Sequence, residues 1–427
     1  MISMTIGRTF LKAFNEKYEH AYDSKGFFKR HFFDLFFSHP HYMLWHTNSP
    51  FVQMKKGQKP HLLSEEERIE KLKNLADKIT SGNRDASIAI GFPASEIKEF
   101  ATTSGLVSNL EIPADESEVY DSWIGAGLGI GVSGGYCIFF NEPKILLKIY
   151  EGWKIYRNFL NDPTISLDPN KITSWNGQWL SYCFSKRYIK DVDFGALDQF
   201  GMFKSDKQGN IQIRTVNWSS LFFNLSREFS DEVLTGYVYS LGQTNKTVGF
   251  FPFHFYQARN IIHYYKRLFG ENNAIRDRWA YEKMFGTHMK RACELGVIGL
   301  QALQPKDLKK YFYDAHIPNF KKPTPPTPQQ GESEEAFFER KQKVSEKNYE
   351  KVILFRTYKT WLIAMITKLT GAIRPTTKSL SGIPKETNLT KNKLWLCSRV
   401  RTEVLSANGS RTTEEPPVFL CTISQSI

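Results

Sequence analysis

The strongest constraint on the fold lies in residues 124–161, which combine a glycine-rich run, a strand pattern and a capped helix. The run reads IGAGLGIGVSGG and leads directly into YCIFF (Tyr136–Phe140), an apolar stretch typical of a buried strand. Asn141 is placed to cap the helix that follows, Pro143 suits its first turn, and the helical pattern ends near Asn161. We therefore expect a loop, a strand and a helix in that order.

The glycine run also contains two well-known functional patterns. Gly129-x-Gly131-x-x-Gly134 matches a dinucleotide fingerprint, and Gly131-x-Ser133-x-Gly135 matches a nucleophile elbow. Both motifs require a helix directly after the glycines, whereas a strand follows here. The run is therefore expected to be a structural loop or a flexible loop whose backbone approaches a phosphate or another chain.

Helix and strand patterns alternate before the glycine run. Gly26–His46 is dense in aromatic residues and predicts a buried helix that ends near His39-Pro40. Ser64–Glu67 predicts a capping box and a helix to about Ile79. Residues 111–121 carry five carboxylates and no basic residue, which predicts a solvated acidic loop.

After the glycine run, residues 172–251 predict short aromatic strands with turns, and helices are expected from His254 onward. The segments 275–295 and 333–370 each predict a helix. The fold class is therefore α+β, with a mixed helix and strand N-terminal body and a helical-bundle C-terminal domain. The expected domains are 1–250, 251–375 with a proline-rich linker at 318–328, and a weakly structured basic tail at 376–427.

Positive charge is concentrated in the second part of the chain. The 427 residues include 57 Lys and Arg against 44 Asp and Glu, a formal net charge of +13. Residues 1–250 hold 28 basic and 28 acidic residues, whereas residues 251–427 hold 29 and 16. A segregated excess of this kind favours a polyanionic partner of the C-terminal part.

Basic side chains, amides and the glycine run together predict a nucleic-acid interface. Helical spacing places Arg276, Lys283 and Lys290 on one face of the segment 275–295. Amides can read base edges, and Lys and Arg can bind phosphates. The candidate nucleic-acid-binding residues are Gly129, Gly131, Ser133, Gly134, Asn176, Gln178, Lys186, Arg187, Arg259, Lys266, Arg267, Arg276, Lys283 and Lys290.

No catalytic, metal or cofactor site is predicted with comparable support. The histidines at 31, 39, 41 and 46 lack the helical pairing of metal ligands, and no cofactor motif is in its required context. An alternative remains open: Asp85, Glu96 and Lys98 resemble a degenerate acid-then-E-x-K nuclease site, which would make the chain a metal-dependent nucleic-acid-processing enzyme.

Several features predict a cytoplasmic chain without a membrane anchor. The N-terminus is charged and has no apolar signal core, and the longest apolar stretch in a helical pattern, Trp361–Ile366, is too short to cross a bilayer. The five cysteines are scattered and include no C-x-x-C pair, which indicates reduced thiols and argues against a zinc ribbon.

The chain resembles the large subunit of type I CRISPR-Cas interference complexes (Cascade). The resemblance lies in the glycine run, strand and EGWKIYRNFLN helix over Gly125–Asn161, the strand-containing body to about Phe250, and the helical basic part with RACELGVIGLQALQPKDLKKYF (Arg291–Phe312). It covers about two-thirds of the chain by layout rather than by a specific signature.

The resemblance implies a non-catalytic subunit that needs no cofactor. Such a subunit helps to recognise the motif beside the target, opens duplex DNA and holds the displaced strand with its C-terminal bundle, while a recruited helicase-nuclease cuts. Its partners would be target DNA, guide RNA and the other subunits. The loop at Gly125–Gly135 with Asn176 and Gln178 would read the motif, and Met284 would start a separate C-terminal fragment.

Overall fold

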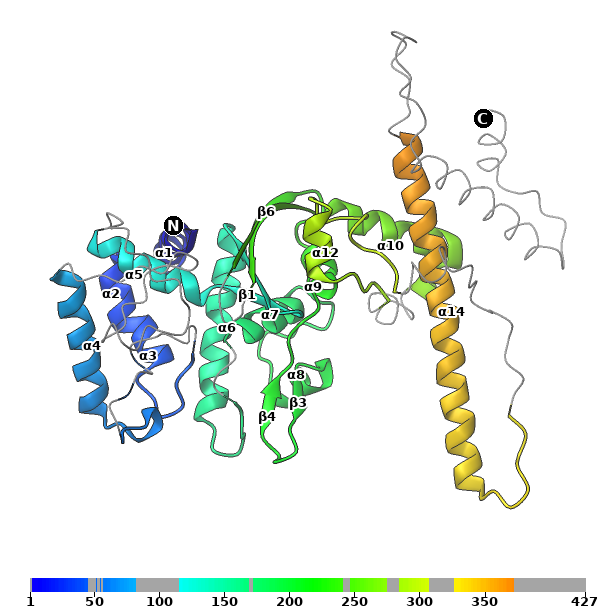
Figure 1. Cartoon of the computed structure of the whole chain (residues 1–427), viewed down its shortest axis with the longest axis horizontal. Helices are drawn as coiled ribbons and strands as arrows, with labels where there is room; N and C mark the ends of the chain where they lie inside the picture. The colour runs from blue at the N-terminus through cyan, green and yellow to red at the C-terminus, as the bar shows by residue number, and fades with distance from the viewer. Residues whose placement is uncertain are drawn as a thin grey trace, which may run out of the picture. The chain divides into compact units, whose positions relative to one another are not determined.

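The computed structural model describes residues 2–44, 51, 54, 57–81, 115–168, 172–240, 246–274, 284–306 and 326–371. It confirms the α+β class, because these residues form many helices and a small antiparallel sheet (Figure 1). The sheet has the strand order β1-β2-β5-β6, and β3 and β4 pair in a separate hairpin. The strands are β1 (Ile130–Val132), β2 (Tyr136–Phe140), β3 (Phe203–Ser205), β4 (Ile211–Ile213), β5 (Val233–Ser240) and β6 (Lys246–His254).

The described helices run from the N-terminus to residue 371. They are α1 (Ile2–Tyr18), α2 (Ser24–Phe27), the π-helical η1 (Phe28–Phe32), α3 (Phe33–Phe36), the 3₁₀ turn η2 (Pro60–Leu62), α4 (Glu65–Thr80), α5 (Glu116–Gly127), α6 (Pro143–Asn161), α7 (Ile172–Cys183), α8 (Phe194–Phe200), α9 (Trp218–Leu225), α10 (Tyr256–Phe269), α12 (Met289–Glu294) and α14 (Glu334–Gly371).

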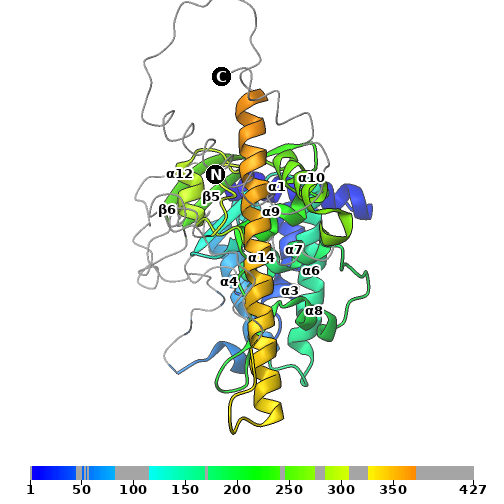
Figure 2. The same ribbon diagram turned by 90° about the vertical axis from the view of Figure 1, so that its right-hand side faces the viewer.

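Local capping signals set the start of several helices as the sequence predicts. Ser64 and Glu67 form the complete capping box of α4. Pro143 opens α6, but the cap is the Glu142 side chain, which accepts a hydrogen bond from the Lys144 amide, so the expected cap at Asn141 is wrong. Ser333 accepts a hydrogen bond from the Ala336 amide before α14, which is one unbroken helix (Figure 2).

The aromatic N-terminal segment forms the expected buried helix, although its geometry differs in detail. α2, η1 and α3 follow one another without a break, and the helical run ends at Phe36, before the expected end near His39-Pro40. Its buried side chains are Phe27, Phe28, Phe32, Phe33 and Phe36. The π-helical turn lies in the middle of this run.

Two sequence-based assignments are wrong for the residues described. Residues 116–121 belong to α5, capped by Asp115 and Glu118, so this part of the expected acidic loop is helical. The segment 172–251 contains α7, α8 and α9 in addition to strands. α7 is buried on all sides from Ser174 to Cys183, so it shows neither helical nor strand periodicity.

The predicted domain boundary after residue 250 falls inside strand β6, which pairs with β5 along its length. Residues 1–307 and 319–368 form one compact unit. Within it, the Leu300 amide donates to Gln257 of α10, and Trp361 of α14 donates to the Leu300 carbonyl. The described helices α10 and α14 therefore contact the segment 298–306, which is bridged to β6. The expected tail at 376–427 lies outside the described residues.

Tryptophans join α6 to α7, which lies beside β1 (Figure 1). The Trp175 and Trp179 rings are stacked at 6.1 Å, and their indole N–H groups donate to the carbonyl oxygens of Gly152 and Lys148 on α6. A Cβ at Gly152 would lie 2.4 Å from the Trp179 ring. The absence of a side chain at Gly152 thus leaves space for the Trp179 ring. The indole N–H groups of Trp175 and Trp179 both have acceptors, as buried donors require.

The glycine run has a packing role along most of its length. A Cβ at Gly125 of α5 would lie 1.8 Å from the Ser3 carbonyl oxygen of α1, and a Cβ at Gly7 would lie 2.0 Å from the Asp121 carbonyl oxygen. The α1 and α5 backbones therefore touch at two glycines. Gly131 and Gly177 make the same kind of contact between β1 and α7, since a Cβ at Gly177 would lie 2.5 Å from the Gly131 carbonyl oxygen.

We expect Gly125→Ala to lower the free energy of unfolding by at least about 2 kcal/mol, because the added methyl group must displace backbone atoms. Urea unfolding followed by circular dichroism measures the change. Gly195→Ala is the matched control: Gly195 lies in α8, its φ is not positive and the nearest atom to an added Cβ is 3.6 Å away. Equal stability of Gly125→Ala and the wild type would contradict the close helix contact.

Candidate nucleic-acid interface

Helix α10 presents a basic face opposite its buried face. Ala258, Ile261 and Tyr265 are buried. Arg259, His263, Lys266 and Arg267 are exposed and lie three to four residues apart, so they share the opposite face of the helix. We call these four residues the α10 basic face. It includes three of the sequence-predicted binding residues.

Two cations of the α10 basic face are paired with exposed carboxylates. The Lys266 Nζ lies 2.6 Å from the Glu271 Oε1, and Arg259 contacts Asp231. The two cations and their two carboxylate partners all have side chains that are at least 45% exposed. Exposed ion pairs of this kind contribute little to stability, so a phosphate group can replace the carboxylate at small cost.

The charge of Lys186 acts on Glu271, the partner of Lys266, although Lys186 lies 80 residues before Lys266 in the chain. The hydrogen bond from Lys266 holds the pKa of Glu271 below its usual value, and the charge of Lys186 acts in the same direction. Lys186 and Arg187 are exposed in the turn after α7. Glu271 therefore interacts electrostatically with two of the predicted residues, Lys266 and Lys186.

The predicted basic row at 276, 283 and 290 is described only at its end. Arg276 and Lys283 lie outside the described residues. Lys290 is exposed on α12, next to Arg291, which pairs with Glu294 at 3.0 Å. Residues 285–288 are not helical, and Phe285 instead forms a bridge with Pro305. The expectation that one helix continues through residues 284–295 is therefore wrong. Met284, the predicted internal start, precedes this bridge.

The amides predicted to read bases are engaged inside the protein. The Asn176 side chain is fully buried: it accepts a hydrogen bond from the Trp153 indole and donates to the carbonyl oxygens of Gly127 and Gly129 at 2.8 Å. The Gln178 amide donates to the Arg214 carbonyl oxygen at 2.8 Å. Because these donors are used and both side chains are buried, the structure gives Asn176 and Gln178 a structural role instead of the expected base-reading role.

Only the tip of the glycine run is open to solvent. Gly129 and Gly131 are buried, and a Cβ at Gly129 would lie 2.7 Å from the Cys137 sulfur. The Ser133 hydroxyl donates to the carbonyl oxygens of Thr215 and Val216, at 3.2 Å each. Gly134 is exposed with φ +98° in the β1-β2 turn. The expected loop is therefore the end of a helix, a strand and a tight turn, of which the turn at 133–135 remains accessible.

The sequence does not predict that the carboxylate of Asp121 is buried. Asp121, in the segment expected to be a solvated loop, is 2% exposed and accepts hydrogen bonds from Arg8 at 3.0 Å and from Ser24. Burial raises the pKa of Asp121, while the bonds from Ser24 and Arg8 oppose this shift. The Asp115 and Glu118 caps predict that Asp121 lies inside a helix, but they do not predict that its side chain is buried.

The described residues provide no metal-binding group of three or more His, Cys, Asp or Glu side chains. Among the described cysteines, Cys137, Cys183 and Cys293 are free thiols, and burial raises the pKa of Cys137 to about 12 and that of Cys293 to about 11. These thiols are therefore protonated at neutral pH. Asp85, Glu96 and Lys98 lie outside the described residues. Within the described part of the chain, no helix has both the length and the apolar character needed to cross a bilayer.

Comparisons of the chain with protein-family models, curated proteins and solved structures found no match.

We expect Asn176→Leu to destabilise the protein by at least about 2 kcal/mol, because it leaves the Trp153 indole N–H and two carbonyl groups without their partner. Asn260→Leu, an exposed position on α10, is the matched control and should change stability little. Chemical denaturation measures both. A stable Asn176→Leu protein that loses only sequence-dependent DNA binding would restore the base-reading role.

Proposed function

We propose that the chain is a non-catalytic nucleic-acid-binding subunit of a type I CRISPR RNA-guided surveillance complex. It would act in the cytoplasm with guide RNA and partner subunits, contact target DNA, help to open the duplex and hold the displaced strand until a helicase-nuclease is recruited. The likeness of residues 125–161 and 291–312 to the large subunits of such complexes supports the proposal.

The observation that carries the nucleic-acid part of the proposal is the α10 basic face. Its cations lie opposite a buried stripe, Arg259 and Lys266 pair with exposed carboxylates, and the charge of Lys186 acts on the carboxylate that pairs with Lys266. Phosphate contacts of this kind supply affinity without sequence information. Of the residues predicted to read the motif, those in the turn at 133–135 remain accessible, so we assign sequence readout to this turn.

We expect the triple variant Arg259→Glu, Lys266→Glu and Arg267→Glu to bind duplex DNA at least tenfold more weakly at low salt. The slope of log affinity against log salt should become shallower by about one unit per lost phosphate contact. Fluorescence anisotropy over a series of salt concentrations measures both quantities.

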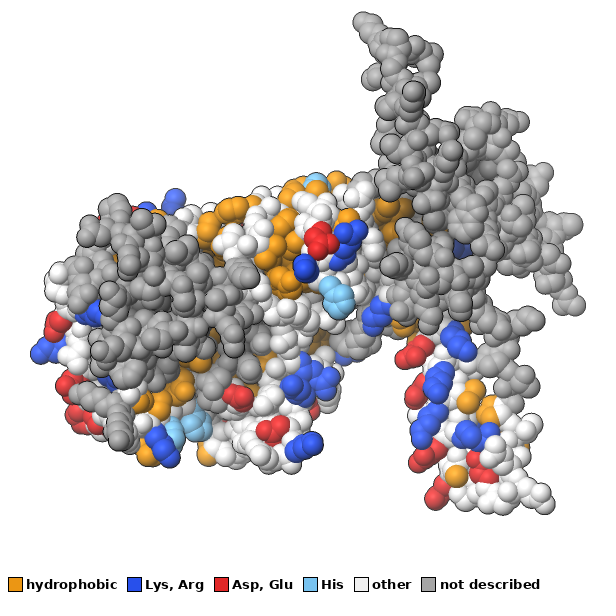
Figure 3. Space-filling model, viewed as in Figure 1, with side chains coloured by type: hydrophobic (Ala, Val, Ile, Leu, Met, Phe, Trp, Pro, Cys, Tyr) orange, Lys and Arg blue, Asp and Glu red, His pale blue; other side chains and the backbone are white. Residues whose placement is uncertain are grey.

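A second triple variant provides the matched control. Lys341→Glu, Lys343→Glu and Lys347→Glu change the net charge equally on the exposed first half of α14, where basic and acidic side chains alternate (Figure 3). We expect this variant to bind nearly as well as the wild type. If both variants lose the same affinity for DNA, the α10 basic face acts only through the net charge of the protein. If the α10 variant loses no affinity, the proposed interface is refuted.

Membership of a guided complex requires a separate measurement. We expect the chain, purified gently from its native cells through an affinity tag, to carry a short RNA with repeated flanking sequence and several other subunits. Sequencing of the RNA and mass spectrometry of the proteins identify both. A monomeric chain without RNA under conditions that preserve known assemblies would contradict the CRISPR assignment while leaving DNA binding by α10 intact.

A further inference from the structure

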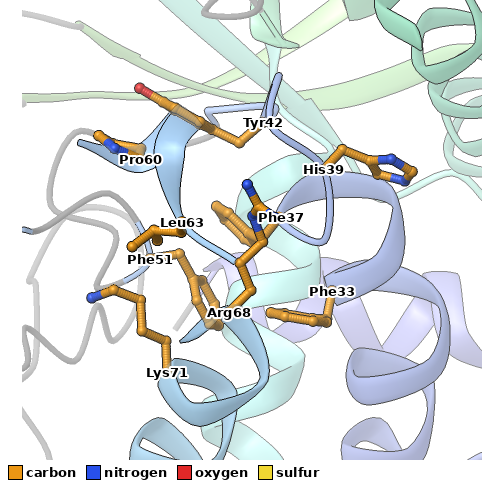
Figure 4. A pocket seen from close by; sticks show the side chains of 9 residues that line it. All are labelled: Phe33, Phe37, His39, Tyr42, Phe51, Pro60, Leu63, Arg68 and Lys71. Carbon is orange, nitrogen blue, oxygen red and sulfur yellow. The ribbon is translucent and has the colours of Figure 1, made fainter. Parts of the chain in front are cut away.

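A narrow pocket lies between the segment that follows α3 and the beginning of α4 (Figure 4). Its walls include Phe37, Phe51 and Tyr42, and its polar lining comes from His39, Arg68 and Lys71. The Phe37 and Phe51 rings are 4.2 Å apart, so one wall is a packed aromatic pair. The enclosed space is about 10 Å³, and the wider hollow that includes the open mouth is about 270 Å³. This pocket is separate from the α10 basic face.

Arg68 is a buried cation that has no counter-ion in the part of the chain that the structure describes. It lies in the first turn of α4, is 8% exposed, and its Nη2 has no hydrogen-bond partner. Figure 4 shows its side chain reaching from α4 to a position beside Phe37. No carboxylate pairs with Arg68 among the described residues. A buried guanidinium in this state costs several kcal/mol relative to a paired one.

A second buried cation increases the positive potential around the pocket. Arg157 of α6 is 4% exposed and donates to the carbonyl oxygens of Leu35 and His41 and to the Asn161 side chain, all of which are uncharged. Burial is the main cause that lowers the pKa of His39, and the charges of Arg157 and Arg68 lower it further, against the opposing effect of Asp34. Most residues that line the pocket are therefore apolar, and the charged residues among them, Arg68 and Lys71, are cations.

We propose that this pocket is an oxyanion site, in which Arg68 binds a phosphate or carboxylate group. The ligand group would accept the hydrogen bond that Nη2 of Arg68 does not make, with Lys71 at the same lining. Charge-assisted bonds between a guanidinium and an oxyanion are the strongest that Arg forms, and the surrounding aromatic rings exclude water that would weaken them. The enclosed space is about the size of one water molecule, so one oxygen of the oxyanion would enter it and the rest of the ligand would remain at the mouth.

The test uses the full-length chain, with sodium phosphate and sodium acetate as probes at an ionic strength held constant with sodium chloride. We expect a saturable rise of the melting temperature and a binding isotherm by calorimetry with at least one of the two probes. The probe that binds more tightly identifies the head group as phosphate or carboxylate. Absence of binding heat with both probes would overturn the proposal without requiring any variant.

Variants of α4 separate a binding role of Arg68 from a structural one. Arg68→Met removes the charge but keeps much of the volume, so we expect a stability in chloride at least equal to that of the wild type and no response to the probe that binds. Lys73→Met, an exposed cation on the same helix, is the matched control and should keep the full response. An unchanged response in Arg68→Met would overturn the assignment. Arg68→Lys should retain a weaker response.

Discussion

The side chain of Asn176 is the interaction on which the arrangement of the sheet and its neighbouring helices depends. One buried amide joins the end of α5, the residue before β1 and the Trp153 indole of α6. It can do so because Gly131 and Gly177 let β1 and α7 approach until their backbones touch. The polar atoms around Asn176 all have partners only while α5, β1, α6 and α7 keep this arrangement. These hydrogen bonds therefore favour one arrangement of the four elements over others as well as stabilising it.

This constraint changes the meaning of the glycine run. A row of alternating glycines is usually associated with ligand binding, yet Gly125, Gly129 and Gly131 are occupied by contacts with other parts of the same chain. The exposed part of the run is Gly134 and Gly135 in the β1-β2 turn, where Gly134 has positive φ. α10, by contrast, is fixed on its buried side through Gln257 and residues 298–306, which leaves its cations on a rigid support.

The sequence predicts those elements whose signals are local. The caps of α4 and α14, Pro143 at the start of α6 and the apolar stretch of β2 identify these elements without tertiary information. α7 and α9 are not recognisable in this way, because helices buried on nearly all sides have no polar face and their aromatic residues favour a strand interpretation. The exposed cations of α10 follow from helical spacing, whereas the burial of Asn176 and Asp121 depends on neighbours that no local pattern reveals.

Burial and partners divide the cations of this chain into three kinds, which a count of charges does not distinguish. Arg259 and Lys266 are exposed beside exposed carboxylates, so they can exchange one anion for another. Arg157 is buried but surrounded by carbonyl oxygens that use its donors, and burial lowers its pKa to about 10 without removing its charge at neutral pH. Arg68 is buried with a donor left over. Arg259 and Lys266 can therefore provide affinity for a polyanion. Arg157 holds α6 against the end of α3. Arg68 has a donor that a negatively charged ligand could accept at one defined point.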